Sequence, residues 1–478
     1  MSATSPPPLT TNPLRRIASD VSRARAVTVP FPPGDLRPSA SRTHGMIVDP
    51  LPRLLDAYER FGPVFTLRIL HAPVVFLLGP EANHYMLVSH AKNFVWREGS
   101  MGDLVPLLGD SLLTTDGVYH RSARKLLLPA FHSEQVATTV DTMVEETARA
   151  LDGWAPGRRL DVYDWTRHLA LRIAMRALLG IDPDTRARGH DPAHEWEAAL
   201  SYYGRDLLVQ SLRGPGTPWA RMRAGRRRLA QLVSDELAAR RRGDDAAEER
   251  GGIVSLLLAA RDEDGEPLSD AAVRDHVLTL LFAGHDTTTA TITFMLYELA
   301  RNPGELAPLL DELDGVLDGR TPTAADLAGG LPRLEAVVDE TLRLYPPAWV
   351  GPRRSVEPFE VAGRQVPGGV HVNYCSWASH RLADVFPDPH AFRAERFLPE
   401  NKAKLPKGAY VPFGGGSRTC IGMRFGLMEV RAIAAMLLQR YSVEVPDGFE
   451  LRISQTPTLG PRDGLPIVVR PRASRTVA

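Results

Sequence analysis

Hydrophobic positions recur mainly with the period of a helix along this chain. Between residues 118 and 300 this spacing continues with few breaks. It returns in "LPRLEAVVDETLRLY", which stops at Pro346 and Pro347, and in "IGMRFGLMEVRAIAAMLLQRY". Runs rich in β-branched residues, "PVFTLRILHAPVVFLLGP" and "FEVAGRQVPGGVHVNYCSWASH", predict short strands instead. The pattern therefore predicts a mainly α fold with a minor β region (α+β).

The longest helical pattern is "SDAAVRDHVLTLLFAGHDTTTATITFMLYELARNPG", with Ser269 as its expected N-cap and Asn302 as the start of its stop signal. A helix of roughly 33 residues would span about 50 Å. Its middle is apolar nearly all round, which predicts a path through the interior. Ala283, Gly284 and Thr287 share one face, and a mid-helix glycine costs about 1 kcal/mol relative to alanine. These residues indicate either the close approach of a ligand or an ordinary helix-packing notch.

The distribution of breaks predicts the domain organisation. Residues 1–45 are rich in Pro, Ser, Thr and Arg, which is typical of an irregular N-terminal leader. Residues 46–471 contain no internal repeat and no linker long or polar enough to divide them, so we expect one domain there. Residues 472–478 are expected to form a flexible C-terminal tail.

Composition narrows the classes of function. The 478 residues include 57 basic and 57 acidic side chains, so no overall field draws the chain to nucleic acid or to an anionic membrane. The two cysteines, Cys375 and Cys420, make neither a disulfide framework nor a four-cysteine zinc site. The N-terminus lacks the apolar core of a signal peptide, and no run of about 18 apolar residues predicts a membrane span. We expect a soluble, cytoplasmic monomer.

The stretch "FGGGSRTCIG" concentrates the candidate chemistry. Cys420 lies where an irregular loop becomes a helix, and the N-H groups at a helix start favour a thiolate, which suits a metal ligand or a nucleophile. Gly414 to Gly416 let the backbone curl close to the sulfur or to a flat group beside it. Arg418 supplies a cation for an anionic group. A packed, inert cysteine and a phosphate-binding loop are the alternatives, although the P-loop and dinucleotide spacings are missing.

The spacing of Phe413, Gly416, Arg418, Cys420 and Gly422 resembles the haem-binding signature of the cytochrome P450 family, in its soluble bacterial type. The resemblance implies a single P450-like domain in which haem b (iron protoporphyrin IX) lies between the long central helix and the helix after the cysteine loop. It implies that Cys420 is the thiolate ligand of the iron, whose electron donation favours O-O cleavage. The other four signature residues would bind the cofactor.

Further motifs in the expected order extend the resemblance over nearly the whole chain from about residue 50. "AGHDTT" resembles the family's oxygen-binding motif. The likeness implies that Thr287 bonds dioxygen, that Asp286 relays protons, and that Ala283 and Gly284 lie against the haem. In "DETLRLYPP" and "AERF" the likeness implies a buried structural network, whose members are Glu340, Arg343 and Arg396.

The resemblance also implies ligands for the haem propionates. His120 and Arg124, one helical turn apart, match the family's motif before "PAF", although the family often has tryptophan at the first position. Arg353 matches another propionate ligand. By position, the substrate pocket should be lined by a set of mostly apolar side chains: Leu104, Val105, Leu108, Phe282, Ala283, Trp349, Val350 and Leu459.

These features favour a monooxygenase that inserts one oxygen atom from O2 into a lipophilic small molecule, by hydroxylation or epoxidation. Terpenoids, steroids, fatty acyl groups and polyketide-like compounds are the candidate classes. Electrons from NAD(P)H would arrive through a separate ferredoxin or flavodoxin-type partner. Its expected docking patch is a set of basic residues: Arg121, Lys125, Lys407 and Arg424.

Other functions remain as alternatives. A peroxygenase or a peroxide isomerase of the same family tends to lack the acid-alcohol pair that Asp286 and Thr287 form. A haem sensor or carrier would be expected to carry an output module, and none is visible in the sequence. An anion-binding protein that uses the glycine loop would bind no haem at all.

Overall fold

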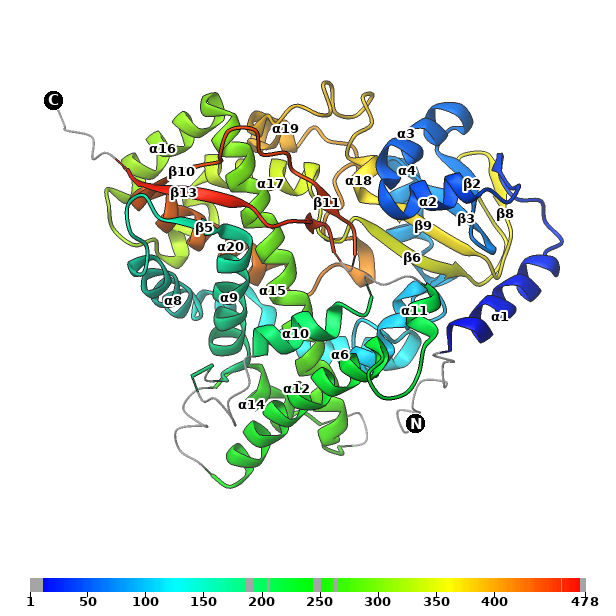
Figure 1. Ribbon diagram of the computed structural model, residues 1–478, viewed down its shortest axis with the longest axis horizontal. Coiled ribbons are helices and arrows are strands. Elements are labelled where there is room, and N and C mark those ends of the chain that lie inside the picture. The colour runs from blue at the N-terminus through cyan, green and yellow to red at the C-terminus, as the bar shows by residue number, and fades with distance from the viewer. Residues whose placement is uncertain are drawn as a thin grey trace.

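We describe a computed structural model of the chain over residues 12–472, except 182, 185–191, 204–206, 244–250, 262–264 and 457. The expected C-terminal tail lies almost wholly outside the described residues. Helices form most of the molecule, and a small mixed sheet lies at one end (Figure 1). Within the described ranges, none of the helices is both long and apolar enough to cross a bilayer.

Helix α15 (Asp270–Arg301) passes through the middle of the molecule (Figure 1). The Ser269 side chain caps it by accepting a hydrogen bond from the N-H of Ala272, and Asn302 ends it. Most of its side chains are buried on all sides. The helices that pack against it include α9 (Val162–Ile173), α12 (Pro218–Arg241), α17 (Pro332–Leu344) and α20 (Met423–Arg440). The predicted ends and interior path of this helix are therefore confirmed.

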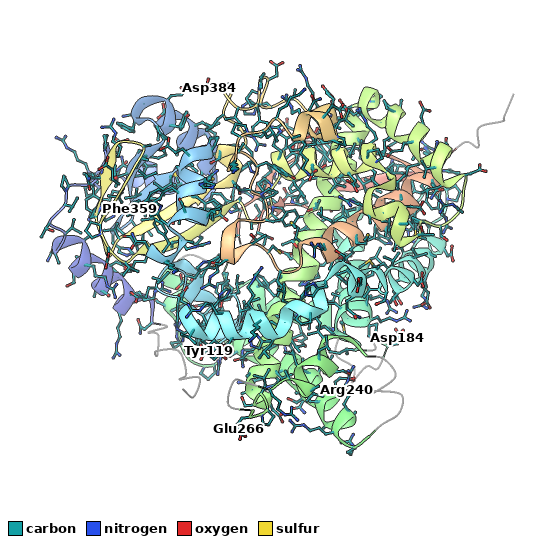
Figure 2. The ribbon with its side chains drawn as sticks, turned by 180° about the vertical axis from the view of Figure 1, so that it is seen from behind. Tyr119, Asp184, Arg240, Glu266, Phe359 and Asp384 are labelled. Atoms are coloured by element: carbon teal, nitrogen blue, oxygen red, sulfur yellow. The ribbon has the colours of Figure 1, made fainter. Side chains whose placement is uncertain are left out.

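The remaining α-helices are mostly short. They are α1 (Pro13–Arg25), α2 (Ala40–Val48), α3 (Pro50–Phe61), α4 (Pro80–His84), α5 (Val105–Leu108), α6 (Gly117–Leu127), α7 (Ser133–Ala137), α8 (Val140–Asp152), α10 (Pro192–Leu200), α11 (Leu207–Ser211), α14 (Gly252–Ala259), α16 (Pro303–Leu317), α18 (Ser376–Ser379) and α19 (Pro399–Lys402). Figure 2, from behind, shows α6, marked by Tyr119, crossing that face of the molecule.

The strands predicted near both ends of the chain join in one sheet with the order β1-β2-β3-β9-β6-β4. Its strands are β1 (Gly34–Asp35), β2 (Val64–Ile69), β3 (Ala72–Leu77), β4 (Phe94–Val95), β6 (Val350–Ser355) and β9 (His371–Cys375). β2 and β3 form a hairpin, whereas β3 and β9 run parallel, with Val74 opposite His371. This pairing gives the sheet strands from both ends of the sequence and places Arg353 in its interior.

Smaller sheets complete the fold. One joins β5 (Arg159–Asp161), β10 (Tyr441–Glu444) and β13 (Pro466–Pro471), and the others are the pairs β7 (Phe359–Val361) with β8 (Arg364–Val366) and β11 (Ile453–Ser454) with β12 (Gly460–Pro461). The residues between β11 and β12 approach the middle of α15. This C-terminal hairpin is important for the site described below.

The N-terminal segment is more regular than its composition indicated. Helix α1 begins at Asn12, whose side chain accepts hydrogen bonds from the N-H groups of Leu14 and Arg15. Its Asp20 carboxylate binds Arg354 and the ring of His71, both on the sheet. Composition did not reveal this helix, because its cap depends on the order of Asn12 and Pro13 and its ion pair with Arg354 joins residues far apart in the chain.

Candidate functional site

The cysteine loop, residues Phe413 to Gly422, precedes α20 and is held by close backbone packing. The N-H of Cys420 donates to the carbonyl of Phe413 over 2.9 Å, which folds the loop back on itself. Gly414 and Gly416 have φ values of +68° and +59°, in the left-handed region that favours glycine. A Cβ on Gly416 would lie 2.2 Å from the carbonyl oxygen of Leu87. Only glycine at position 416 therefore lets the loop approach that neighbouring segment.

Cys420 is exposed even though protein surrounds its loop, so its sulfur faces an enclosed space rather than bulk water. Desolvation by that surrounding protein raises the pKa of the Cys420 thiol. The N-H groups of Gly422 and Met423 and the nearby Arg124 oppose this rise. The N-H groups at the start of α20 thus lower the pKa of the thiol as predicted, but the rise caused by burial is larger. A metal cation at the sulfur would reverse the balance, because a coordinating thiol loses its proton.

One accessible stretch interrupts the buried middle of the central helix. Ala283 is exposed and Gly284 and Thr287 are half-buried, although most residues on either side of them are buried. The Thr287 hydroxyl donates to the carbonyl oxygen of Ala283 over 2.8 Å, so it is satisfied within its own helix. A Cβ on Gly284 would contact only Ala174. This face carries no bulky side chain and leaves room for a flat group.

Two arginines predicted to contact the cofactor lie near the same tryptophan ring. The guanidinium of Arg353 lies 3.5 Å from the centre of the Trp96 ring, and that of Arg418 lies 5.0 Å from it. Arg418 also donates to Asp116 over 2.6 Å and to the carbonyl of Thr115 over 2.7 Å. Burial lowers the pKa of each arginine to about 10, so both remain charged at neutral pH.

His120 and Arg124, both on α6, lie close to Arg418. Burial first, and then the positive charges of Arg418 and Arg124, lower the pKa of His120 to about 3. His120 is therefore a neutral ring at physiological pH. Within the described part of the chain, the Arg124 guanidinium has no carboxylate partner. The cluster holds more positive than negative charge, which suits a cofactor with carboxylate groups.

The structure places the predicted acid and alcohol on different sides of α15. Asp286 is 5% exposed, and its Oδ2 accepts a hydrogen bond from the Thr458 hydroxyl of the C-terminal hairpin. Thr287 instead lies on the accessible face. The sequence contains no signal for the contact with Thr458, because it joins residues far apart in the chain.

A second buried carboxyl was not predicted. Glu429 of α20 is fully buried, and its Oε2 accepts a hydrogen bond of 2.9 Å from Thr288 of α15. Its Oε1 has no partner among the described residues. Desolvation raises the pKa of Glu429 to about 8, so it is mainly protonated at neutral pH. An acidic residue within the apolar run "GLMEVRAIAAML" was the available signal for it.

Glu340, Arg343 and Arg396 come together as one cluster. Arg343 makes a bidentate pair with Glu340 at 2.7 and 2.8 Å, and both side chains are fully buried. Arg343 also donates to three backbone carbonyls, those of His380, Pro389 and Ala391. Nε of Arg396 lies 3.5 Å from Glu340. Every hydrogen-bonding group of the Arg343 side chain thus has a partner.

The residues predicted to line a substrate pocket differ in exposure. Leu104, Val105, Trp349 and Val350 are half-buried and Ala283 is exposed, whereas Phe282 is buried. Leu108 and Leu459 are fully buried, because they pack into the hydrophobic core. Two residues next to this predicted set also have accessible surface: Ala348, which precedes Trp349, and Thr458, which precedes Leu459.

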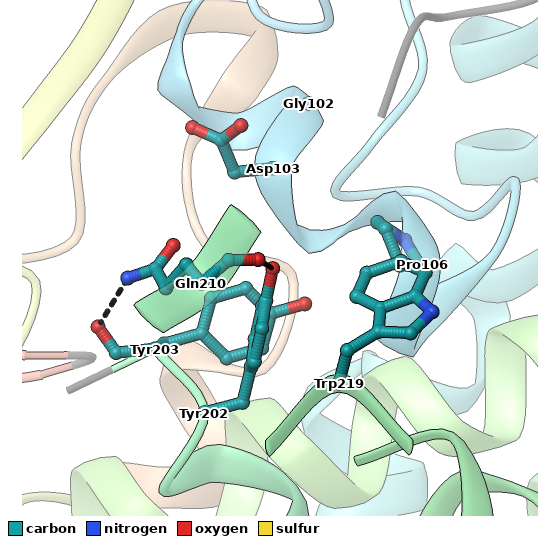
Figure 3. A pocket seen from close by; sticks show the side chains of 7 residues that line it. All are labelled: Gly102, Asp103, Pro106, Tyr202, Tyr203, Gln210 and Trp219. Carbon is teal, nitrogen blue, oxygen red and sulfur yellow. Dashed lines mark hydrogen bonds between the residues drawn. The ribbon is translucent and has the colours of Figure 1, made fainter. Parts of the chain in front are cut away.

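A separate small pocket lies between the segment around α5 and the residues around Tyr202, Gln210 and Trp219 (Figure 3). Its walls include Asp103 and Pro106 on one side and Tyr202, Tyr203 and Trp219 on the other. The Tyr202 hydroxyl donates to the carbonyl of Gln210 over 2.9 Å. All four residues of the expected docking patch are exposed: Arg121, Lys125, Lys407 and Arg424.

Comparisons with known proteins agree over most of the chain. The sequence model of the family described as Cytochrome P450 matches residues 49–464. The chain is 34% identical to the cyclooctat-9-en-7-ol 5-monooxygenase of Streptomyces melanosporofaciens over 77% of this chain and 79% of that protein. It is 33% identical to the cyclooctatin synthase of the same organism, over 88% and 91% respectively.

Two solved structures resemble the fold closely. A retinoic acid-bound cyanobacterial CYP120A1 superimposes with a TM-score of 0.81 and 26% identity over 93% of this chain and all of that one. The haem domain of cytochrome P450DA superimposes with a TM-score of 0.83 and 25% identity over 94% and 99% of the two chains.

Proposed function

Because this chain belongs to the cytochrome P450 family and is a haem-thiolate monooxygenase, we propose that Cys420 is the thiolate ligand of its haem iron. The observation that carries this proposal is the exposure of Cys420 in a loop that Gly416 brings against the backbone of Leu87. The other cysteine, Cys375, is fully buried, and its sulfur accepts a hydrogen bond from the N-H of Ala378. Burial raises the pKa of Cys375 to about 12, so it is poorly suited to act as a ligand.

We propose that the remaining predicted residues hold a haem b between α15 and the cysteine loop. When bound, the haem supplies the electron transfer and oxygen chemistry that the protein side chains lack. Arg124, Arg353 and Arg418 would bind its carboxylate groups as cations. His120, which is neutral, would act as a single hydrogen-bond partner. Phe413, Gly416 and Gly422 would shape the loop around the ligand, with Ala283 and Gly284 against the opposite face.

Asp286 and Thr287 are proposed to deliver protons in the reaction. Thr287 lies on the accessible face of α15, where its hydroxyl can exchange the carbonyl of Ala283 for another partner. Asp286 is the adjacent acid and would pass protons from the hairpin side of the helix toward Thr287. This pair favours ordinary oxygen activation over the use of peroxide.

We propose that the substrate is a lipophilic small molecule. The accessible side chains Leu104, Val105, Trp349 and Val350 support this class, since none of them carries a charge. The names of the relatives point the same way, as one is named for cyclooctat-9-en-7-ol and one solved structure holds retinoic acid. The reaction would be a hydroxylation or an epoxidation.

Electrons would come from NAD(P)H through a separate ferredoxin or flavodoxin-type partner. The exposed residues Arg121, Lys125, Lys407 and Arg424 support a basic docking patch for an acidic partner of this kind. Replacing them with Glu should slow reduction by the partner and leave the haem spectrum unchanged. Unaltered reduction of this variant would exclude the patch.

The decisive experiment is an absorption spectrum of the reduced protein under carbon monoxide. A thiolate-bound haem gives a strongly red-shifted band. We expect Cys420→Ser to abolish this band, whereas the matched variant Cys375→Ser should retain it because the Cys375 side chain is fully buried in β9 and cannot reach a ligand. A wild-type protein that binds no haem, or a Cys420→Ser protein that keeps the band, would overturn the proposal. Spectral shifts across a panel of lipophilic compounds would then narrow the substrate.

A further inference from the structure

The contact between Asp286 and Thr458 has no place in the function proposed so far. The Thr458 hydroxyl donates to Oδ2 of Asp286. Within the described part of the chain it is the one recorded hydrogen-bond donor to that carboxylate, and no ion pair to Asp286 is recorded there. A buried acid that functions in proton transfer is thus held by a single neutral group.

The side of α15 on which Asp286 meets Thr458 matters for the reaction. Consecutive residues of a helix are rotated by about 100°, so the side chains of Asp286 and Thr287 leave α15 on different sides. Thr287 lies on the accessible face, whereas Asp286 is buried against the C-terminal hairpin. The carboxyl group must leave Thr458 before it can turn toward Thr287. The bond to Thr458 therefore opposes the movement that proton delivery needs.

The other groups near Asp286 do not replace this bond. Tyr163 of α9 lies near it, and desolvation first and the charge of Asp286 second raise the pKa of that phenol to about 12. The guanidinium of Arg167 lies over the Tyr163 ring, 4.5 Å from its centre. His285 is fully buried, and its Nδ1 bonds the carbonyl of Leu281 in its own helix. A hydrogen bond from a neutral donor breaks more readily than a buried ion pair, so the bond from Thr458 to Asp286 can break and form again.

Thr458 is itself held in place by its neighbours. The N-H of Leu459 donates to the carbonyl of Pro347 over 2.9 Å, and Leu459 is fully buried. The indole N-H of Trp349 donates to the carbonyl of Gln455 over 2.8 Å. These contacts fix the hairpin against the loop before β6, so the hydroxyl that binds Asp286 has a defined position rather than a mobile one.

We propose that Thr458 is a positioning residue that holds Asp286 in a resting orientation and so limits proton delivery until the hairpin or the carboxyl moves. The inference rests on the proton-transfer role proposed for Asp286. On release, the Asp286 carboxylate would take up one proton from water and pass it to the Thr287 side of the helix, which returns Asp286 to its starting state. The net proton thus comes from solvent, and neither side chain is consumed.

The first experiment tests the hydrogen bond between Thr458 and Asp286 without turnover. It measures amide hydrogen exchange of residues 453–461 in the oxidised holoprotein. We expect Thr458→Val to speed exchange of the Leu459 amide about fivefold, the factor that an ordinary hydrogen bond represents. Thr458→Ser should exchange like wild type. Asp286→Asn should also do so, because its amide oxygen still accepts the Thr458 hydroxyl. Wild-type exchange in Thr458→Val would overturn the inference.

The second experiment tests the effect on proton delivery with no substrate. The reduced holoprotein is mixed with oxygenated buffer, and the return of the oxidised spectrum is timed in H2O and in D2O. In this decay oxygen removes one electron from the metal and, by the proton-assisted route, takes up one proton. We expect Thr458→Val to decay about fivefold faster with a solvent isotope effect, and Thr458→Ser to restore the wild-type rate.

The double variant separates this inference from the proposed function. If Asp286 supplies the proton, Thr458→Val should have no effect in an Asp286→Asn background. If Thr458→Val still speeds the decay in that background, the proposed role of Thr458 as a positioning residue for Asp286 would be wrong, because Thr458 would then act through another group. If Asp286→Asn alone decays like wild type, the proposed role of Asp286 fails, and the inference fails with it. Faster exchange together with an unchanged decay would show a structural contact only and would also overturn the inference.

Discussion

Two buried polar clusters on neighbouring helices differ in how completely their hydrogen bonds are satisfied. In the first cluster, on α17, Arg343 is bound by Glu340 and by three backbone carbonyls. In the second, between α15 and α20, Asp286 has one neutral donor and Glu429 has an oxygen without a partner among the described residues. Both clusters carry ionisable groups in the interior, but only in the Glu340–Arg343 pair of the first cluster does every side-chain polar atom have a hydrogen-bond partner.

The difference separates two uses of buried charge. A fully bonded pair has no low-energy alternative, so it fixes the structure around it. A sparsely bonded acid can change partner or proton at a cost of about one hydrogen bond, which is what proton transfer requires. We therefore expect the α17 cluster to determine stability and the cluster between α15 and α20 to determine chemistry and pH dependence.

The largest expected effect is at the α17 cluster. Arg343→Ala leaves the Glu340 carboxylate buried without its partner, which should lower the free energy of unfolding by about 3–5 kcal/mol. Arg393→Ala, which removes only an exposed pair with Asp388, is the control and should cost less than about 1 kcal/mol. Thermal unfolding of the purified holoproteins measures both. Equal losses of unfolding free energy in the two variants would contradict the expected difference between a fully hydrogen-bonded buried pair and an exposed pair.

The second effect concerns Glu429 and depends on pH. Since burial raises its pKa from 4.5 to about 8, the folded protein binds more protons than the unfolded chain between those values. The contribution of Glu429 to the free energy of unfolding should therefore be fully present below about pH 4.5. It should fall as the pH rises toward 8, by at most about 1.4 kcal/mol per pH unit. Glu429→Gln removes this term, so its stability should fall less across that range.

Denaturant unfolding at pH 5.5, 7 and 8.5 measures this difference. Glu444→Gln is the matched control, since Glu444 is exposed and makes only a surface pair with Arg470. Its curve should stay parallel to that of wild type. If the Glu429→Gln curve is also parallel, the carboxyl is already ionised in the folded protein.

A smaller effect is expected at Thr288. Thr288→Val keeps the shape of the side chain but removes the hydroxyl that binds Glu429, which should cost about 1 kcal/mol of stability. Thr288→Ser retains the donor and should recover most of that loss. Because Thr288 lies beside Thr287, haem content is measured in parallel. A cost above about 3 kcal/mol would mean that this cluster is as structural as the one on α17.

The smallest effect on stability is expected at Thr287, where the effect on chemistry should be large. Its hydroxyl bonds only the carbonyl of Ala283 in its own helix, so Thr287→Ala should change the free energy of unfolding by less than about 0.5 kcal/mol. We expect the same variant to consume electrons with little product. The ratio of product to NAD(P)H consumed, measured with any compound that wild type oxidises, tests this. Intact coupling would exclude the proposed role of Thr287.

Local patterns were sufficient for the elements and for much of the site. Ser269 and Asn302 defined the ends of α15, and Pro346 and Pro347 predicted the end of α17. The spacing within the cysteine loop singled out Cys420 because a short segment carries the whole motif. In each case the deciding interactions lie within a few residues of one another.

Features formed by distant residues were not accessible from the sequence. The pairing of β3 with β9, the bond between Arg418 and Asp116 and the bond between Thr458 and Asp286 all join segments far apart in the chain. Helix α1 was missed because Asp20 stabilises it through the sheet. Leu108 and Leu459, expected beside the substrate, are fully buried among core residues, and their place beside a substrate stays a prediction because an apolar residue is equally compatible with either place.

The parallel pairing of β3 with β9 has a consequence for biogenesis. Strand β9 is synthesised long after β3, and Cys420 later still, so the sheet cannot close while the ribosome is making the first half of the chain. Contacts of such large sequence separation slow folding and leave strand edges open in the meantime. Pigment should therefore be acquired after release of the nascent polypeptide, and we expect chaperones and slow expression to raise the yield of coloured protein.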